Sequence, residues 1–146
     1  MTRPAVTIAS GADPVSGDAP VFAQRPPHGR VFTASRTVRS TDVTPDGRLR
    51  FDALARYLQA VAEDDVGDAG LTEPYVWLVR RLAVAIRGYP ARGEPLELTT
   101  FCSATGPRWA ERTTTVNASG RDLMQGRAIY AAVARDGRHS VPLGPA

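Results

Sequence analysis

The sequence has few of the residues on which several common enzyme chemistries depend. It contains one cysteine, Cys102, two histidines, His28 and His139, and no lysine. A single cysteine excludes an internal disulfide and is typical of the cytoplasm, where we expect the protein. No His/Cys cluster has metal-ligand spacing, no G-x-S-x-G motif is present, and neither histidine is placed to serve a Ser or Cys triad. We therefore expect no metal, no cofactor and no triad.

Long apolar runs and a clustered positive charge are also missing. No apolar run approaches the ~18 to 20 residues of a membrane-spanning helix, so we expect no membrane partner. The net charge is +3 and all 18 basic residues are arginines. They are scattered along the chain, whereas nucleic-acid binders tend to cluster them, so we expect no nucleic-acid partner.

The hydrophobic pattern predicts strands around one helix. Residues 1–29 are rich in Pro, Gly, Ala and Ser, and we predict a flexible tail there and one folded domain over 30–146. Residues 31–43 alternate like a strand, 51–66 form an amphipathic helix, and four strand segments with short turns follow (75–90, 94–106, 108–120 and 126–137). Strands joined by short turns are antiparallel, and a lone helix buries its apolar side only against their sheet. The predicted fold class is α+β, a five- to six-stranded antiparallel sheet wrapped around one long central helix.

Three consecutive acids, Glu63, Asp64 and Asp65, lie near the end of the predicted helix. Relative to Leu54, Asp65 falls at about 20°, on the apolar side, and Asp64 at about 280°, at its border. A carboxylate on the apolar side loses hydration, which suits a general base in a ligand cavity. Alternatively, the helix frays before this point and Asp65 lies in solvent. Asp65 and then Asp64 are therefore catalytic candidates.

Other acids have simpler interpretations. Glu63 falls at about 180°, on the polar face, where we expect solvation and a pair with Arg56 or Gln59. Asp42 and Asp46 precede the helix, close to its positive end. Asp46 is a further catalytic candidate, but it occupies a turn position that Asp favours for local hydrogen bonding.

Four segments resemble one known family. They are "VRSTDVTPDGRLRFDALARYLQ" (38–59), "WLVRRLAVAIRGYPARGEPLEL" (77–98), "RWAERTTTV" (108–116) and "GRAIYAAVARDGRHSVPL" (126–143). In this order they are similar to the acyl-ACP thioesterase family, specifically its N-terminal hotdog half, over about residues 31–143. The resemblance implies the hotdog fold and an acyl thioester substrate, carried by acyl carrier protein or CoA.

The resemblance does not extend to the catalytic pattern of that family. The positions corresponding to D-x-N-x-H hold Thr44, Asp46 and Arg48, and the helical Glu position falls near Ala60. We expect Thr44 and Arg48, at the helix start, to contact substrate instead.

Arg80 and Arg81 interrupt an apolar strand, and strict alternation points them to opposite faces. Arg81 matches the strand pattern of the family. It either forms an ion pair, for which Asp64, Asp65 and Glu97 are candidate partners, or binds a pantetheine or nucleotide phosphate.

The sequence thus predicts a thioesterase acting on acyl-ACP or acyl-CoA in fatty-acid or polyketide metabolism. The predicted catalytic residues are Asp65, Asp64 and Asp46, and the predicted substrate-binding residues are Thr44, Arg48, Tyr57, Trp77 and Arg81. The alternatives are a non-catalytic acyl-binding or partner-binding hotdog, and a hydratase or tailoring enzyme acting on an acyl thioester. Because one helix leaves open sheet edges, we expect a homodimer or homotetramer.

Overall fold

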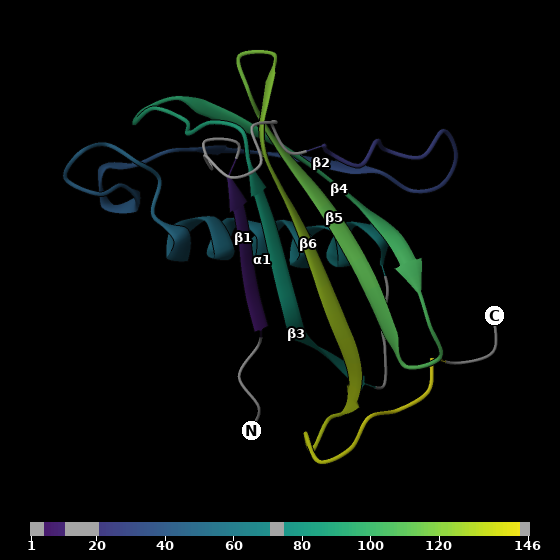
Figure 1. Cartoon of the computed structure of the whole chain (residues 1–146). Coiled ribbons are helices and arrows are strands. Elements are labelled where there is room, and N and C mark those ends of the chain that lie inside the picture. The colour runs from purple at the N-terminus through teal and green to yellow at the C-terminus, as the bar shows by residue number, and fades with distance from the viewer. Residues whose placement is uncertain (1–4, 11–20, 71–74, 144–146) are drawn as a thin grey trace.

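The computed structural model describes the backbone of residues 5–10 and all atoms of residues 21–70 and 75–143 (Figure 1). One long helix lies across one face of a single six-stranded sheet, whose strand order is β1-β3-β6-β5-β4-β2. The elements are β1 (Ala5–Ser10), β2 (Phe32–Thr37), the short 3-10 helix η1 (Ser40–Asp42), α1 (Phe51–Ala69), β3 (Tyr75–Ile86), β4 (Pro95–Thr105), β5 (Trp109–Ala118) and β6 (Arg121–Ala134).

The sheet confirms the predicted α+β hotdog architecture and adds a parallel strand. Strands β3, β6, β5, β4 and β2 pair antiparallel in that order. Strand β1 pairs in parallel with the outer edge of β3, over Arg81–Ile86. The first antiparallel strand is shorter than the predicted 31–43, because the chain turns into η1 after Thr37.

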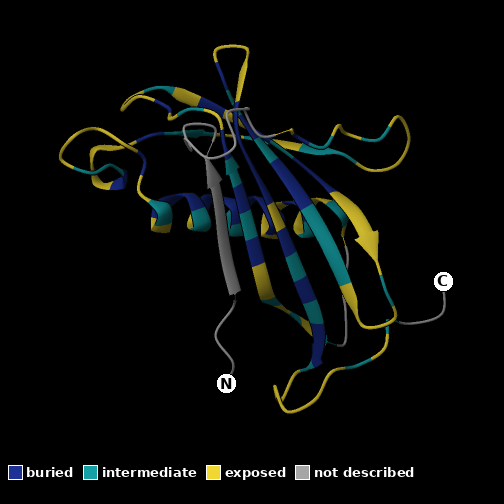
Figure 2. Ribbon diagram, in the orientation of Figure 1, coloured by how far each residue is buried: buried dark blue, intermediate teal, exposed yellow. Residues whose placement is uncertain are grey.

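Helix α1 extends three residues beyond the predicted end at Val66. Gly67 stays within the helix, and Gly70 ends it in the left-handed conformation, with its N–H directed at the carbonyls of Gly67 and Val66. The helix buries one side against the sheet, as Figure 2 shows. Leu58 packs directly onto Gly126 of β6, where an added Cβ would lie 2.7 Å from a Leu58 methyl carbon. The missing side chain at Gly126 therefore leaves room for the end of the Leu58 side chain against the sheet.

A β-bulge changes the predicted orientation of the two strand arginines. The register of β3 against β6 shifts between Val79 and Arg81, so one extra residue is inserted in β3. Val79 and Leu82 both pack into the core, while Arg80 and Arg81 between them are both exposed. The prediction that the arginines point to opposite faces is wrong, because it assumed unbroken alternation.

Parts of the predicted tail, residues 1–29, lie on the domain. β1 belongs to the sheet, and the Phe22 ring is 4% exposed, with the Arg87 guanidinium carbon 3.8 Å from its centroid. The amide of Gln125 on β6 exchanges two 2.8 Å hydrogen bonds with the backbone of Ala23. A domain boundary at residue 29 would therefore separate residues that pack together, because the Phe22 ring is buried and Ala23 bonds to the buried Gln125 amide.

Candidate functional site

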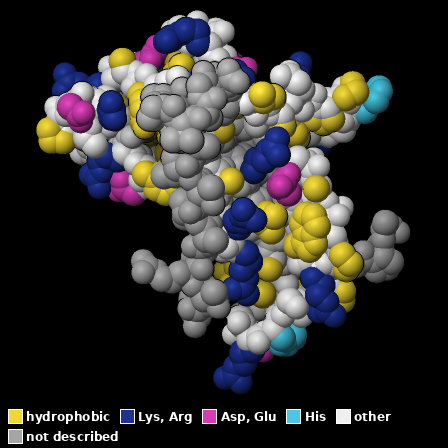
Figure 3. Space-filling view, viewed as in Figure 1, with side chains coloured by type: hydrophobic (Ala, Val, Ile, Leu, Met, Phe, Trp, Pro, Cys, Tyr) yellow, Lys and Arg dark blue, Asp and Glu magenta, His cyan; other side chains and the backbone are white. Residues whose placement is uncertain are grey.

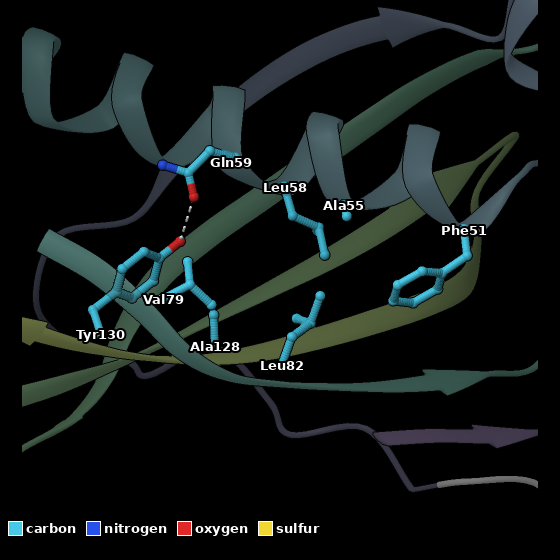
Figure 4. A pocket seen from close by; sticks show the side chains of 8 residues that line it. All are labelled: Phe51, Ala55, Leu58, Gln59, Val79, Leu82, Ala128 and Tyr130. Carbon is cyan, nitrogen blue, oxygen red and sulfur yellow. Dashed lines mark hydrogen bonds between the residues drawn. The ribbon is translucent and has the colours of Figure 1, made fainter. Parts of the chain in front are cut away.

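An apolar pocket of about 260 Å³ lies between α1 and the inner face of β3 and β6 (Figure 4). Its lining is Phe51, Ala55, Leu58 and Gln59 from the helix, Val79 and Leu82 from β3, and Ala128 and Tyr130 from β6. Figure 4 shows Phe51 at one end and the polar groups of Gln59 and Tyr130 at the other. The pocket therefore suits an elongated apolar group that ends in a polar function.

A chain of hydrogen bonds leads from the polar end of this pocket to the surface. The Tyr130 hydroxyl donates to Gln59 Oε1 at 3.3 Å, and Gln59 Nε2 donates to Glu63 Oε1 at 3.3 Å. Burial raises the pKa of Tyr130, and the charge of Glu63 raises it further against the opposing effect of Arg112. Tyr130 therefore stays a protonated donor and fixes the Gln59 amide with its N–H groups toward Glu63.

Glu63 differs from the other helix carboxylates in its partners. Helix α1 carries five acids, and four of them form ion pairs with arginine: Asp52 with Arg50, Asp64 with Arg36, Asp65 with Arg30 and Arg112, and Asp68 with Arg30. Among the residues that the structure describes, Glu63 has no arginine partner and is exposed. Glu63 does not line the apolar pocket, but its carboxylate is linked to the polar end of the pocket through Gln59.

Asp65, the first catalytic candidate from the sequence, is buried as the helical wheel predicts, and the helix does not fray before it. Its carboxylate accepts hydrogen bonds from Arg112 Nη1 at 2.6 Å and Arg30 Nε at 2.7 Å. Arg81 is exposed on the opposite face of the sheet, so Asp65, one of its three candidate partners from the sequence, does not pair with it. Asp65 lines a second pocket, of about 360 Å³, rather than the apolar one.

Asp64, the second candidate, lies at the surface beside the β2 edge. Its carboxylate pairs with Arg36 Nη2 at 2.7 Å, and its side chain is about half exposed. This charge is compensated and Asp64 does not line the apolar pocket.

Thr44, Asp46 and Arg48 meet in one exposed turn before the helix. The Thr44 hydroxyl donates to the Asp46 carboxylate, which lowers the pKa of Asp46, and the Thr44 N–H donates to the Arg48 carbonyl at 2.8 Å. The Arg48 guanidinium lies 5.2 Å from the Tyr89 ring centroid. The turn satisfies its own polar groups, as the turn chemistry of the sequence suggests, and none of these residues lines the apolar pocket.

Tyr57 faces a buried acid rather than the pocket. Its hydroxyl donates to Asp42, which also accepts from Arg56 Nη2 and the Arg39 N–H, both at 3.2 Å. Burial and the Asp42 bond raise the pKa of Tyr57 to about 12, whereas the Tyr57 bond is the main cause that lowers the pKa of Asp42. This contact ties η1 to the helix.

Trp77, the remaining candidate, packs against the core on the inner face of β3. Its ring meets Tyr75 edge-to-face, with centroids 5.4 Å apart. It does not line the apolar pocket. A structural role, which is common for Trp in a strand, accounts for these contacts.

Sequence reasoning found part of the pocket site and missed the rest. The predicted contact between Gln59 and Glu63 is confirmed, because residues four apart share a helix face. Tyr130 was missed, since it lies 71 residues from Gln59 and no motif marks it. The alternation of β6 could have indicated only that Tyr130 faces inward.

Within the described residues, no three His, Cys, Asp or Glu side chains gather as a metal site would require. In the same part of the chain, no helix combines the length and hydropathy needed to span a bilayer.

The comparisons with known proteins agree on one family. A family model described as the acyl-ACP thioesterase N-terminal domain matches residues 29–144. The chain is 29% identical over 92 residues to the chloroplastic dodecanoyl-[acyl-carrier-protein] hydrolase of Cinnamomum camphora, covering 55% of this chain and 24% of that protein. It is 25% identical over 114 residues to an uncharacterized protein of Mycobacterium tuberculosis, covering 77% of this chain and 46% of that one. The chain thus spans less than half the length of these curated relatives.

Solved structures show the same fold. An acyl-ACP thioesterase from Bacteroides thetaiotaomicron superposes with a TM-score of 0.72 at 21% identity, over 78% of this chain and 49% of that one. A probable thioesterase from Bartonella henselae superposes with a TM-score of 0.72 at 12% identity, over 79% of this chain and 100% of that one. At these identities the likeness shows the fold alone.

Proposed function

Because the chain belongs to the acyl-ACP thioesterase N-terminal domain family, we propose that it binds an acyl thioester in the pocket between α1 and the sheet and hydrolyses it. The observation that carries this proposal is the pocket itself, which is apolar along its length and ends at Gln59 and Tyr130. The acyl chain lies toward Phe51, and the thioester carbonyl lies at the polar end. The carrier thiol then points outward, past Glu63.

Glu63 supplies the base in this proposal. Its carboxylate takes a proton from a water molecule, whose oxygen attacks the thioester carbonyl carbon. The tetrahedral intermediate collapses with cleavage of the C–S bond, and the leaving thiolate takes the proton from Glu63, which gives a free acid and a thiol and restores the Glu63 carboxylate. Gln59 is a positioning residue, because its N–H donates to Glu63 while its carbonyl is held by Tyr130.

The carrier, the assembly and the location belong to the same proposal. The carrier is acyl carrier protein or CoA, and the setting is fatty-acid or polyketide metabolism in the cytoplasm. The assembly is at least a dimer, since none of the described strands pairs with Val76–Arg80 on the β1 side. Light scattering checks the assembly, and a stable species at the chain mass of 15.6 kDa would contradict it.

To test the proposal, the purified 146-residue chain is incubated with a panel of acyl-CoA and acyl-carrier substrates, and the products are identified by mass spectrometry. Free acid should form with the wild type, and Glu63→Gln should lower its rate by about 10²-fold or more, as expected for losing a positioned base. Asp64→Asn removes the same charge from the adjacent, arginine-paired residue and should stay within a fewfold of the wild type. Loss in Asp64→Asn with retention in Glu63→Gln would assign the base to Asp64 and refute this mechanism.

A non-catalytic acyl-binding hotdog is the second candidate. The observation favouring it is that the positions of the family's catalytic pattern hold Thr44, Asp46 and Arg48, which bond to one another in a closed turn. Unchanged substrate that remains bound to the protein would support this alternative. A mass gain of one water in the intact thioester would instead indicate a hydratase.

A further inference from the structure

The apolar pocket between α1 and the sheet is long and narrow. Its helix side runs from Phe51 to Gln59, which at 1.5 Å per residue corresponds to a length of about 12 Å. Its volume of about 260 Å³ over this length gives a mean cross-section of about 22 Å². The pocket therefore has the shape of a channel that runs along the helix.

These dimensions match those of a single alkyl chain. A methylene group fills about 30 Å³, close to the volume of one water molecule in the liquid, and a zigzag of 1.5 Å bonds lengthens by about 1.3 Å per carbon. The cross-section of such a chain is thus about 23 Å², and the length and the volume of the pocket each correspond to about nine carbons. An aromatic ring or a branched chain is wider than this channel.

The Phe51 ring closes one end of the pocket. Phe51 is the first residue of α1, and among the described residues none before it in the chain lines the pocket. Its side chain is partly buried and packs against the core, and Figure 4 shows its ring pointing toward Leu82. Carbons beyond this ring would meet no further apolar lining.

Two alanines leave room for a chain in the middle of the pocket. Ala55 on α1 and Ala128 on β6 both line it. Figure 4 shows both between the end formed by Phe51 and the end formed by Tyr130. A larger side chain at either position would fill space that the methylene groups of a ligand otherwise occupy.

The sheet separates this pocket from the outer face of the domain. Figure 3 looks onto that outer face, where arginine and hydrophobic side chains cover the strands. The pocket lies behind a continuously hydrogen-bonded sheet. A chain therefore enters beside the helix, and the Phe51 ring limits how far it reaches.

We infer that Phe51 and Ala55 determine which acyl groups the protein accepts, namely unbranched chains of about eight to ten carbons whose methyl end meets the Phe51 ring. The inference rests on the proposed function for the identity of the ligand and for its direction in the pocket. Each methylene buried in the pocket strengthens binding about fourfold. A shorter chain gives up part of this gain, and a longer chain adds nothing to it.

Titration calorimetry with a series of S-alkyl-CoA thioethers tests the length limit. These compounds lack the carbonyl and cannot be hydrolysed, so binding is measured without chemistry. With the 146-residue chain, the dissociation constant should fall about fourfold per added carbon and level off at about nine carbons.

Variants of the lining should move this plateau in opposite directions. Phe51→Ala opens the end of the pocket and should lengthen the preferred chain by about three carbons, since the site relaxes only partly around the missing ring. Ala55→Leu adds three carbon atoms to the lining and should shorten the preferred chain by about three carbons. Ala60→Leu makes the same change at a half-buried position of α1 that does not line the pocket, and it should leave the plateau at its wild-type length.

Several outcomes would overturn the inference. They are no binding of any thioether, a dissociation constant that falls to the longest chain of the series, a plateau that neither Phe51→Ala nor Ala55→Leu moves, or an equal shift in Ala60→Leu. Hydrolysis of acyl-CoA is measured separately. If the plateau and its shifts are observed but acyl-CoA is not hydrolysed, the proposed hydrolysis fails and the length limit stands; if hydrolysis occurs without a plateau, only the length limit fails.

Discussion

The Asp65→Asn variant distinguishes a structural role of Asp65 from a catalytic one. The Asp65 carboxylate is 9% exposed and accepts hydrogen bonds from Arg112, which is 18% exposed, and Arg30, which is 46% exposed. Asparagine keeps the shape of the side chain but removes its charge, so Arg112 stays inside the domain without a counterion. We expect the protein to lose stability mainly through Arg112, because this arginine is less exposed than Arg30 and its unpaired charge is less well hydrated.

The magnitude follows from the burial of Arg112. Removing one partner of a buried ion pair costs about 3–5 kcal/mol. Arg112 retains a 3.2 Å hydrogen bond to Thr100 and some contact with solvent, so we expect the lower end, about 3 kcal/mol. For a domain of this size, such a loss lowers Tm by about 10 °C.

Urea unfolding of wild type, Asp65→Asn, Arg112→Met and the double variant measures this energy, with equal m-values as a check on two-state behaviour. The double variant should be more stable than Asp65→Asn, because it leaves no unpaired charge. Hydrolysis per folded molecule should be preserved in Asp65→Asn. If the free energy of unfolding of this variant is within about 0.5 kcal/mol of the wild-type value but the variant no longer hydrolyses substrate, Asp65 is the catalytic carboxylate and the assignment to Glu63 is refuted.

Three further predictions concern the rest of the fold. Tyr57 lowers the folded-state pKa of Asp42, so this contact stabilises the protein above the ordinary pKa of Asp and is lost as pH falls through the lowered value. Asp42→Asn should therefore lower the free energy of unfolding in urea by about 2 kcal/mol at pH 7 and by progressively less in acid. A difference between variant and wild type that stays constant with pH would contradict this. Gly126→Ala should cost about 1 kcal/mol in urea unfolding, because the added methyl group displaces the end of the Leu58 side chain; a stability equal to that of the wild type would contradict this. Deleting residues 1–29 should lower Tm by several degrees in a thermal melt, because the Phe22 contacts are lost. An unchanged Tm would instead support the flexible tail predicted from composition.

The sequence by itself determined the features that depend on near neighbours along the chain. Helical periodicity placed Asp65 on the buried side of α1 and Gln59 beside Glu63, and both are confirmed. Turn chemistry predicted the closed turn around Asp46. The residue types at these positions fix local geometry, because a helix or turn is formed by residues a few positions apart.

Only the tertiary structure decided which distant residues meet. Asp65 pairs with Arg112, 47 residues away, and not with Arg81, because a bulge in β3 turns Arg81 to the other face. Tyr130 reaches Gln59 because the register of β6 against β3 brings it under the helix. Strand register, bulges and the approach of a helix to a sheet follow from the packing of the whole core, so the pocket and the bond from Tyr130 to Gln59 had no local signal in the sequence.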